Sequence, residues 1–350
     1  MGTQEEITIK QFGAPSKIHY GFGKEYLKTW GLKEALREIY QNFLDYGDYS
    51  EISSEDEEYS YVSIVNDWKP DSLDFLRVGN SKKNNVNAIG KHGEGLKMAF
   101  LILLRLGYES KIMTTKFIVY PQFYSDKEIG ECFCLVYREH NIPNQEFTVE
   151  FQCLTSEYKS FKENLILKSD VIFDDNYYGE IVSKLQGNIY SGGLFVCHLD
   201  NISKAYNISP AQLPLDRDRQ VPQSFDVSWA ASKINSAYGK WTTKDLHHSD
   251  TQYLDKVPEE VVKQFKPKMV GNDIQFVYKG EDGKDRIVNN SNIKSALQND
   301  SFFTGAIKKL KMFIATKLGL YDLLIEFKGK HVRGAEAIAD FDVILQRVTK

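Results

Sequence analysis

Residues 32–46 carry a hydrophobic pattern with a helical period and a second, polar pattern beside it. Four apolar side chains share one face of the predicted helix: Leu36, Ile39, Tyr40 and Phe43. Glu38, Asn42 and Asp45 are spaced by four and three residues and form another stripe, rotated away from the first. Such a helix buries its apolar face and directs a carboxylate, an amide and a second carboxylate to one place. A magnesium–phosphate site is a reason for that arrangement.

Other segments show equally clear periods. The pattern predicts an apolar helix over 96–106, a buried strand over 61–65 and a short helical turn over 74–78. From residue 110 onward apolar and polar positions alternate, which is typical of antiparallel strands. Four strands are predicted there: 111–123, 131–137, 146–154 and 188–197, the last with an irregularity at Gly192-Gly193.

Two stretches lack a period and predict loops. Residues 1–31 contain several glycines and a proline, which indicates a lead-in arm with turns instead of a long element. Residues 50–60 are acidic and predict a solvated connector.

The hydrophobic pattern of the C-terminal part differs from that of the residues before it. Its predicted elements are a helix up to residue 240, a hairpin over 274–288 that turns at 280–283, an amphipathic helix over 302–318 and a strand over 321–327. The change places a domain boundary at 220–245, so we expect one domain over 1–220 and a smaller α/β domain over 221–350.

Composition bounds the function and leaves nucleic-acid binding open but unsupported. With 350 residues, 42% of them hydrophobic, the chain can bury a substantial core. The formal net charge of −4 provides no basic field to attract nucleic acid or anionic lipid. The N-terminus lacks an apolar signal core, and no apolar run has the length of a membrane span, so we expect a cytoplasmic protein with no membrane partner.

The chain has four cysteines, too few and too scattered for a disulfide framework. None of them forms a C-x-x-C metal pair. We expect reduced, mostly buried thiols at Cys132, Cys134, Cys153 and Cys197.

A glycine-rich run lies directly before the apolar helix. Gly90, Gly93 and Gly95 allow backbone N–H groups to approach a phosphate, and the helix N-terminus adds its dipole. Lys97, in the first helical turn, is a candidate phosphate partner. The run alone is a weak signal, because a glycine loop before a helix is often only a turn. It also matches neither the P-loop pattern nor a dinucleotide-binding fingerprint, which must follow a strand.

The two regions together are more specific. A Glu-x-x-x-Asn-x-x-Asp helix, an acid or amide after a strand, Gly-x-Ser-x-Lys and then Gly-x-x-Gly-x-Gly occur in that order within about sixty residues. Over about 20–220 the chain resembles the GHKL ATPase superfamily, which includes gyrase-type topoisomerases, ninety-kilodalton heat-shock chaperones, histidine kinases, MutL and MORC proteins. It looks most like stand-alone bacterial and phage ATP-binding proteins, including the phage rIIA type. The resemblance implies an α+β fold, with a Bergerat-type sandwich of a mainly antiparallel sheet and helices on one face. The domain over 221–350 lies outside the resemblance and has no assigned role; a transducer-like role is one option.

The resemblance also implies roles for individual residues. Glu38 matches the carboxylate that orients and deprotonates the attacking water, and Asn42 matches the amide that binds magnesium, with Asp45 as its support. Thr148 matches the threonine that holds adenine through water. The implied lid extends over 79–97, and its expected ATP-binding residues are Gly79, Ser81, Lys82, Lys83, Gly90, His92, Gly93, Glu94, Gly95, Leu96 and Lys97.

One position departs from the family pattern. Relatives show Asp-x-Gly-x-Gly after the strand, where the aspartate accepts the adenine amino group and the glycines leave room for the ring. Here Asn66 stands at the aspartate position, Asp67 follows it, and Trp68 and Pro70 replace glycines. Either Asn66 accepts through its carbonyl oxygen or Asp67 does so after a shift of one residue.

Arg217 and Arg219 leave two interpretations open. They form either a sensor of the terminal phosphate, as a basic residue does in several relatives, or part of a surface salt-bridge loop with the neighbouring acids.

The expected function is that of an ATPase switch. ATP and magnesium would order the lid, hydrolysis would release it, and the ATP-bound lid would support a homodimer and contacts to an unidentified protein partner. The process stays open between a host interaction and a DNA-related role. A nucleotide-binding sensor or scaffold with negligible turnover is the alternative. The basic residues within 302–333 fit a solvated helix face better than a nucleic-acid partner.

Overall fold

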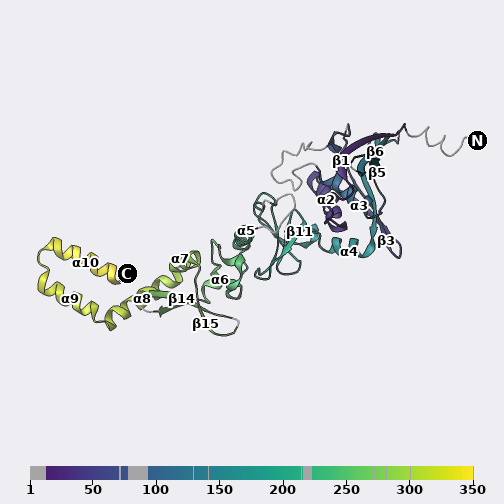
Figure 1. Cartoon of the computed structure of the whole chain (residues 1–350). Coiled ribbons are helices and arrows are strands. Elements are labelled where there is room, and N and C mark those ends of the chain that lie inside the picture. The colour runs from purple at the N-terminus through teal and green to yellow at the C-terminus, as the bar shows by residue number, and fades with distance from the viewer. Residues whose placement is uncertain are drawn as a thin grey trace, which may run out of the picture. The chain divides into compact units, whose positions relative to one another are not determined.

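The computed structural model describes residues 13–349 except 71, 78–93, 129, 141, 214, 216–222, 271, 272, 281 and 300. The fold is α+β and divides into two compact units (Figure 1). The first unit comprises Met1–Ile172, Gly179–Leu199 and Lys204–Gln223, and the second comprises Phe173–Tyr178, Asp200–Ser203 and Ser224–Lys350.

A seven-stranded sheet forms the frame of the first unit (Figure 1). Every neighbouring pair in it is antiparallel. In spatial order the strands are β1 (Ser16–Gly23), β6 (Gly130–Glu139), β5 (Phe117–Asp126), β4 (Ser110–Met113), β7 (Phe147–Leu154), β3 (Tyr59–Asn66) and β2 (Ser50–Glu55).

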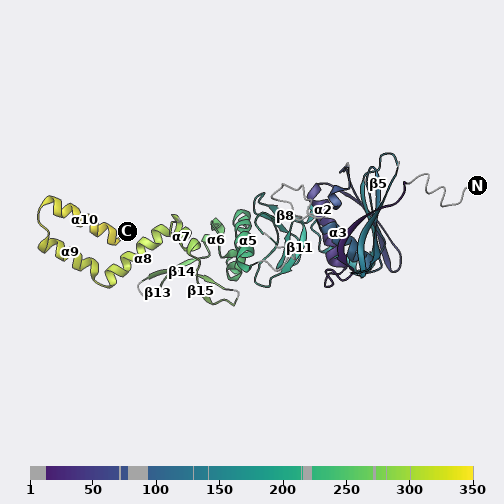
Figure 2. The same cartoon turned by 45° about the horizontal axis from the view of Figure 1, so that its top comes forward.

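Two helices cover one face of this sheet. They are α2 (Leu32–Tyr46) and α3 (Gly95–Arg105), which pack against each other and lie on the same side of the strands in Figure 2. The predicted helices at 32–46 and 96–106 are thus confirmed. The sheet residues Ile64 and Val149 are completely buried and belong to the same apolar core as α2 and α3. Each such buried aliphatic side chain contributes roughly 1.5–3 kcal/mol.

Both edges of the sheet were predicted to be loops, and both predictions are wrong. β1 pairs with β6, although 1–31 was expected to lack a long element. β2 pairs with β3 along its whole length, although 50–60 was expected to be a connector. An edge strand bonds its backbone on one side only, and most side chains of β2 are exposed, so no alternation marks it in the sequence.

The predicted strand over 111–123 is two strands. Thr114 separates β4 from β5, and its Oγ1 accepts hydrogen bonds from the backbone N–H groups of Lys116 (3.3 Å) and Phe117 (3.0 Å). These bonds close a tight turn of the kind that Thr side chains support. Another helix, α4 (Thr155–Glu163), follows β7 and packs against α2. All four cysteines are buried with free thiols.

A smaller mixed sheet follows, and all its strands except the second half of β8 belong to the first unit. Its strands in spatial order are β11 (Leu194–His198), β10 (Asn188–Ser191), β12 (Ala205–Ile208), β9 (Gly179–Val182) and β8 (Val171–Asp174). The predicted single strand over 188–197 is the β10–β11 hairpin. Gly192 (φ 57°) and Gly193 (φ 82°) have positive φ, which suits the tight turn between the strands.

The second unit has its own core around Trp241, Phe265 and Phe276. It contains α5 (Ser224–Tyr238), α6 (Glu259–Val262), α7 (Ser291–Asn299), α8 (Ser301–Lys317) and the antiparallel strands β13 (Lys266–Val270), β14 (Asp273–Lys279) and β15 (Asp285–Ile287). The β14–β15 hairpin confirms the predicted turn. The second unit contains both helices and strands, as expected. Its described strands are antiparallel, so it lacks the alternation of helices with parallel strands that defines an α/β domain.

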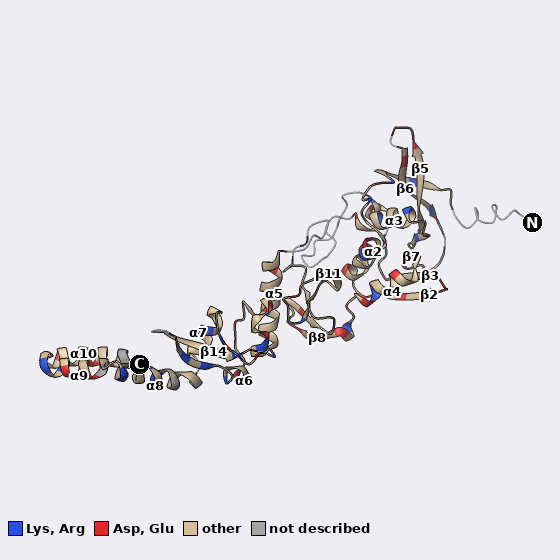
Figure 3. Cartoon of the chain, turned by 60° about the horizontal axis from the view of Figure 1, so that its bottom comes forward, with Lys and Arg blue, Asp and Glu red and all other residues tan. Residues whose placement is uncertain are grey.

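The chain continues into α9 (Leu320–His331) and α10 (Ala335–Thr349). The predicted strand over 321–327 is wrong, because this segment lies in α9. Leu323 and Phe327 are spaced by one helical turn and both are exposed, so the apolar run that suggested a buried strand is not buried. Figure 3 shows charges of both signs on α9 and α10, and Lys328 pairs with Asp342 at 2.5 Å. Among the described residues, no helix is long and apolar enough to cross a membrane.

Candidate functional site

Glu38 lies in the middle of α2 on the side that faces α3. Glu38 is only 7% exposed. Nη2 of Arg37 lies 3.6 Å from Oε1 of Glu38. Within the described part of the chain, Arg37 is the only cation within ion-pair distance of this carboxylate. Burying a carboxylate whose single cation partner is distant destabilises the folded state. Such groups are common at functional sites.

The first residue of α3, Gly95, touches Glu38. A Cβ atom built on Gly95 would overlap Oε2 of Glu38 and lie 3.1 Å from its Cδ. Any other residue would therefore displace the carboxylate. A helix N-terminus carries partial positive charge and unpaired N–H groups, and the start of α3 places these beside the carboxylate of Glu38. The structure thus brings together two residues that the sequence analysis placed on separate motifs.

Asn42 lies one turn further along α2 and is half-buried. Its Nδ2 donates a hydrogen bond to the backbone carbonyl of Glu38 at 2.6 Å. Because Nδ2 is bonded to the helix backbone, Oδ1 is the atom of the amide that can bind a ligand. Asp45, in the next turn, is also half-buried. The polar stripe of the predicted helix is therefore continuous along α2.

Lys97 occupies the first turn of α3 but does not extend into solvent. It is 1% exposed, and its Nζ donates to the backbone carbonyl of Phe75 at 3.3 Å. Burial lowers the pKa of Lys97 to about 8, although the nearby Glu94 raises it. Its contact to a phosphate stays a prediction. Leu96, beside it, is buried in the core.

The expected adenine corner lies where β3 meets β7. Asn66 is buried at the end of β3, and its Oδ1 accepts a hydrogen bond from the backbone N–H of Trp68 at 3.2 Å. Asp67 is exposed. On β7, Thr148 is buried, donates to the carbonyl of Glu146 and accepts from Nε2 of Gln145, both at 3.1 Å.

Trp68 fills the corner with an aromatic ring in place of the expected glycine. Its ring stacks on Tyr46 with a centroid distance of 4.6 Å. It also meets Phe75 at 4.9 Å and Phe147 at 4.8 Å. The corner therefore offers an aromatic surface, whereas the one carbonyl oxygen predicted to bind a base is engaged by the backbone.

Several expected site residues lie outside the described residues, and their positions stay predictions: Gly79, Ser81, Lys82, Lys83, Gly90, His92, Gly93, Arg217 and Arg219. In the part of the chain that the structure describes, no group of three or more His, Cys, Asp or Glu residues could hold a metal ion. Asn42 with ligand phosphates and water is the set expected for magnesium, which keeps several waters and needs few protein ligands.

The sequence analysis missed a buried polar network on the other face of α2. The carboxylate of Glu51 on β2 accepts hydrogen bonds from Tyr40 (2.7 Å), from Lys162 (2.7 Å) and from Tyr158. The two tyrosine hydroxyls are 3.1 Å apart. Tyr40 was assigned to the apolar stripe, and Glu51 to a loop, so no pattern in the sequence could connect them.

Comparisons with known proteins add no relative. No protein-family model matches the chain, and no curated protein matches it. The likeness to GHKL ATPases therefore rests on the residues and their order.

Proposed function

We propose that this protein binds ATP with magnesium and hydrolyses it slowly, and that the nucleotide state controls a lid over 79–97 and a homodimer. The single observation that carries the proposal is the contact of Gly95 with the buried carboxylate of Glu38. It unites the acidic helix and the glycine-rich run, which are the two halves of the expected site. The lid, the dimer and a protein partner come from the resemblance alone.

Each half supplies a different part of the chemistry. Glu38 would accept the proton of the attacking water, a role that contributes typically 10²–10⁴-fold to a rate. Asn42 would offer Oδ1 to magnesium, which would neutralise charge on the phosphates. The N-terminus of α3 would bind phosphate oxygens through backbone N–H groups.

The aromatic surface at Trp68 would hold the base by stacking. Oδ1 of Asn66 already accepts the Trp68 N–H, and a neutral amide oxygen is a weaker acceptor for an adenine amino group than a carboxylate. We therefore expect weaker discrimination between ATP and GTP than an aspartate would give.

A nucleotide-binding module with negligible turnover is the second candidate. The Arg37–Glu38 pair favours it, because a cation 3.6 Å from the carboxylate competes with water for that group. Turnover measurements separate the two functions, whereas nucleotide binding is common to both.

Magnesium-dependent nucleotide binding tests what the two candidates share. Calorimetric titration with ADP should show tighter binding with magnesium than with EDTA. Asn42→Ala should remove that difference and leave binding in EDTA unchanged, since it removes the only proposed metal ligand. Asn164→Ala, directly after α4, is the matched control and should retain the magnesium effect. Absence of ADP and ATP binding by the wild type would eliminate both functions.

A further inference from the structure

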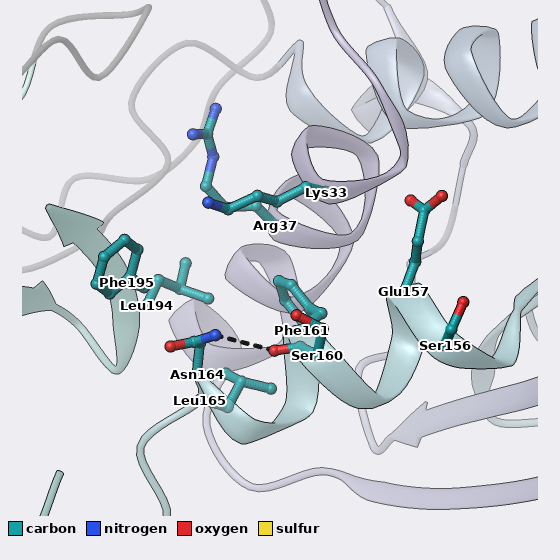
Figure 4. A pocket seen from close by; sticks show the side chains of 10 residues that line it. All are labelled: Lys33, Arg37, Ser156, Glu157, Ser160, Phe161, Asn164, Leu165, Leu194 and Phe195. Atoms are coloured by element: carbon teal, nitrogen blue, oxygen red, sulfur yellow. Dashed lines mark hydrogen bonds between the residues drawn. The ribbon is translucent and has the colours of Figure 1, made fainter. Parts of the chain in front are cut away.

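A cavity of about 340 Å³ opens between α2, α4 and the β10–β11 hairpin, away from the polar stripe of Glu38 and Asn42. Figure 4 shows side chains from all three elements directed toward it. Its volume lies at the lower end of the range for small-molecule sites, so it fits a compact ligand. None of its lining residues belongs to the site proposed for ATP.

Two sides of the cavity carry apolar side chains. Phe195 and Leu194 come from the start of β11, and Phe161 and Leu165 come from the end of α4 and the residues after it. In Figure 4 the ring of Phe161 faces the pair from β11 across the opening. Two aromatic rings on opposite sides can hold a flat apolar body between them.

The α2 side of the cavity carries two cations. Lys33 and Arg37 are one helical turn apart on α2. In Figure 4 Lys33 extends toward Phe195, whereas the guanidinium of Arg37 points to the top of the view and lies 5.6 Å from the centre of the Trp30 ring. Nζ of Lys33 lies 5.2 Å from the centre of the Phe195 ring. The one acid of the lining, Glu157, is exposed and lies to the right of both cations in Figure 4, on the N-terminal part of α4.

Arg37 has unused hydrogen-bonding capacity on this side. Its Nε is buried and has no hydrogen-bond partner among the described residues. Its Nη2 approaches Glu38 only to 3.6 Å, which is too long for a hydrogen bond. A buried donor without a partner destabilises the fold, and an anion beside the guanidinium would interact with its positive charge.

Asn164 supplies a neutral polar group at the cavity. Its Nδ2 donates to the carbonyl oxygen of Ser160 at 2.9 Å, the bond drawn in Figure 4. Its Oδ1 is thereby left as an acceptor for a ligand hydroxyl or amide.

We propose that this cavity binds a small aromatic anion. The anionic group meets Arg37 and Lys33, and the flat body lies between Phe161 and Phe195. The cavity is separate from the proposed nucleotide site except at Arg37, and the proposal holds whether or not the protein hydrolyses ATP. Because Arg37 also faces Glu38, a bound anion shares this guanidinium with the carboxylate of α2.

Calorimetric titration of the full chain with 1-naphthoate tests the proposal. Acetate, which lacks the apolar body, and 1-naphthalenemethanol, which lacks the charge, should each bind at least about tenfold more weakly. Lys33→Met and Arg37→Met should each weaken naphthoate binding by about tenfold or more. Lys159→Met removes a cation from α4 that does not line the cavity and should leave the affinity unchanged.

Ser160→Phe provides a variant that does not alter a cation. Ser160 is exposed at the cavity, so a ring placed there blocks the opening without removing core packing. It should abolish naphthoate binding and retain ADP binding. Equal binding by wild type and Ser160→Phe, equal binding of the neutral alcohol, or displacement of naphthoate by ADP would each overturn the proposal. Loss of ADP binding alone would concern only the nucleotide site.

Discussion

The two faces of α2 carry buried polar groups in very different surroundings. On one face the carboxylate of Glu51 receives three hydrogen bonds, two from tyrosines and one from Lys162. On the other face Glu38 has a single cation at 3.6 Å and the backbone of Gly95 against it. The first arrangement satisfies a half-buried carboxylate with hydrogen bonds, and the second leaves a more deeply buried carboxylate with one cation beyond hydrogen-bond distance. The difference separates a structural network from a candidate site.

The titration of the network supports this distinction. Burial alone would raise the pKa of Glu51, but hydrogen bonds from Lys162, Tyr158 and Tyr40 lower it overall. Burial, with Glu51 nearby, raises the pKa of both tyrosines. At neutral pH the carboxylate is therefore ionised and the hydroxyls keep their protons, which is the state that the hydrogen bonds require.

The largest effect on stability is expected from Glu51→Ala. It leaves two buried hydroxyls and an ammonium without their acceptor, and we expect a loss of about 3 kcal/mol in the free energy of unfolding. Urea denaturation at pH 7 measures this loss. Glu55→Ala, in the same strand, removes an exposed pair with Lys159 and should cost less than about 0.5 kcal/mol.

The pH dependence of the same pair has a definite sign. Because the pKa of Glu51 is lowered in the folded state, its contribution is present above the ordinary carboxyl pKa and is lost as the pH falls below it. The gap between wild type and Glu51→Ala should therefore shrink in acid. If Glu51→Ala and Glu55→Ala lowered the free energy of unfolding equally at pH 7, the network around Glu51 would not have the stabilising role assigned to it.

Gly95→Ala tests the other face. The new methyl group would displace the Glu38 carboxylate, and a misplacement of about 1 Å can cost about 10²-fold in rate. We expect ATP turnover to fall by about that factor while the melting temperature and ADP affinity change little. Gly305→Ala, at a helical glycine with open space around it, is the control. Full turnover by Gly95→Ala would show that the contact has no part in hydrolysis.

The smallest effect is expected from Lys97→Met, and its sign is opposite to that of Glu51→Ala. The pKa of Lys97 is lowered to about 8, so the folded state pays to keep this side chain charged at pH 7. The variant should gain about 1–2 kcal/mol of stability at pH 7. If Lys97 binds phosphate, the same variant should lose ADP affinity.

Raising the pH should remove that gain. Between the lowered pKa and the ordinary lysine value, the unfolded chain holds a proton that the folded chain has released, so wild-type stability rises with pH. The wild type should therefore approach Lys97→Met as the pH goes from 7 to 9.5 in urea titrations. A constant difference across that range would contradict the burial of a charged ammonium.

The central helices of the fold were predictable because their periods are strong. α2 and α3 each combine an apolar face with a clear start or end, such as Gly47 after α2. β2 was not predictable, because an edge strand of Ser and Glu residues is held by backbone pairing to β3 and shows no buried face. α9 was misassigned because its apolar residues are exposed, so their grouping carries no information about a core.

The candidate site was predictable in its residues but not in its contacts. Glu38 and Asn42 follow from spacing within one helix. The approach of Gly95 to Glu38 depends on how α2 packs on α3, and the use of Oδ1 of Asn66 by Trp68 depends on a local turn. Arg37 gave no signal, because a single arginine beside an acid is ordinary on a helix.

The most direct test of the central claim is ATP turnover by Glu38→Gln, measured as phosphate release with magnesium. The substitution keeps the size of the side chain and removes its capacity to accept a proton. The account predicts that ATP affinity stays within about threefold of the wild type while phosphate release falls at least about 10²-fold. Unchanged phosphate release by Glu38→Gln, with ATP still bound, would contradict the assignment of Glu38 as the base.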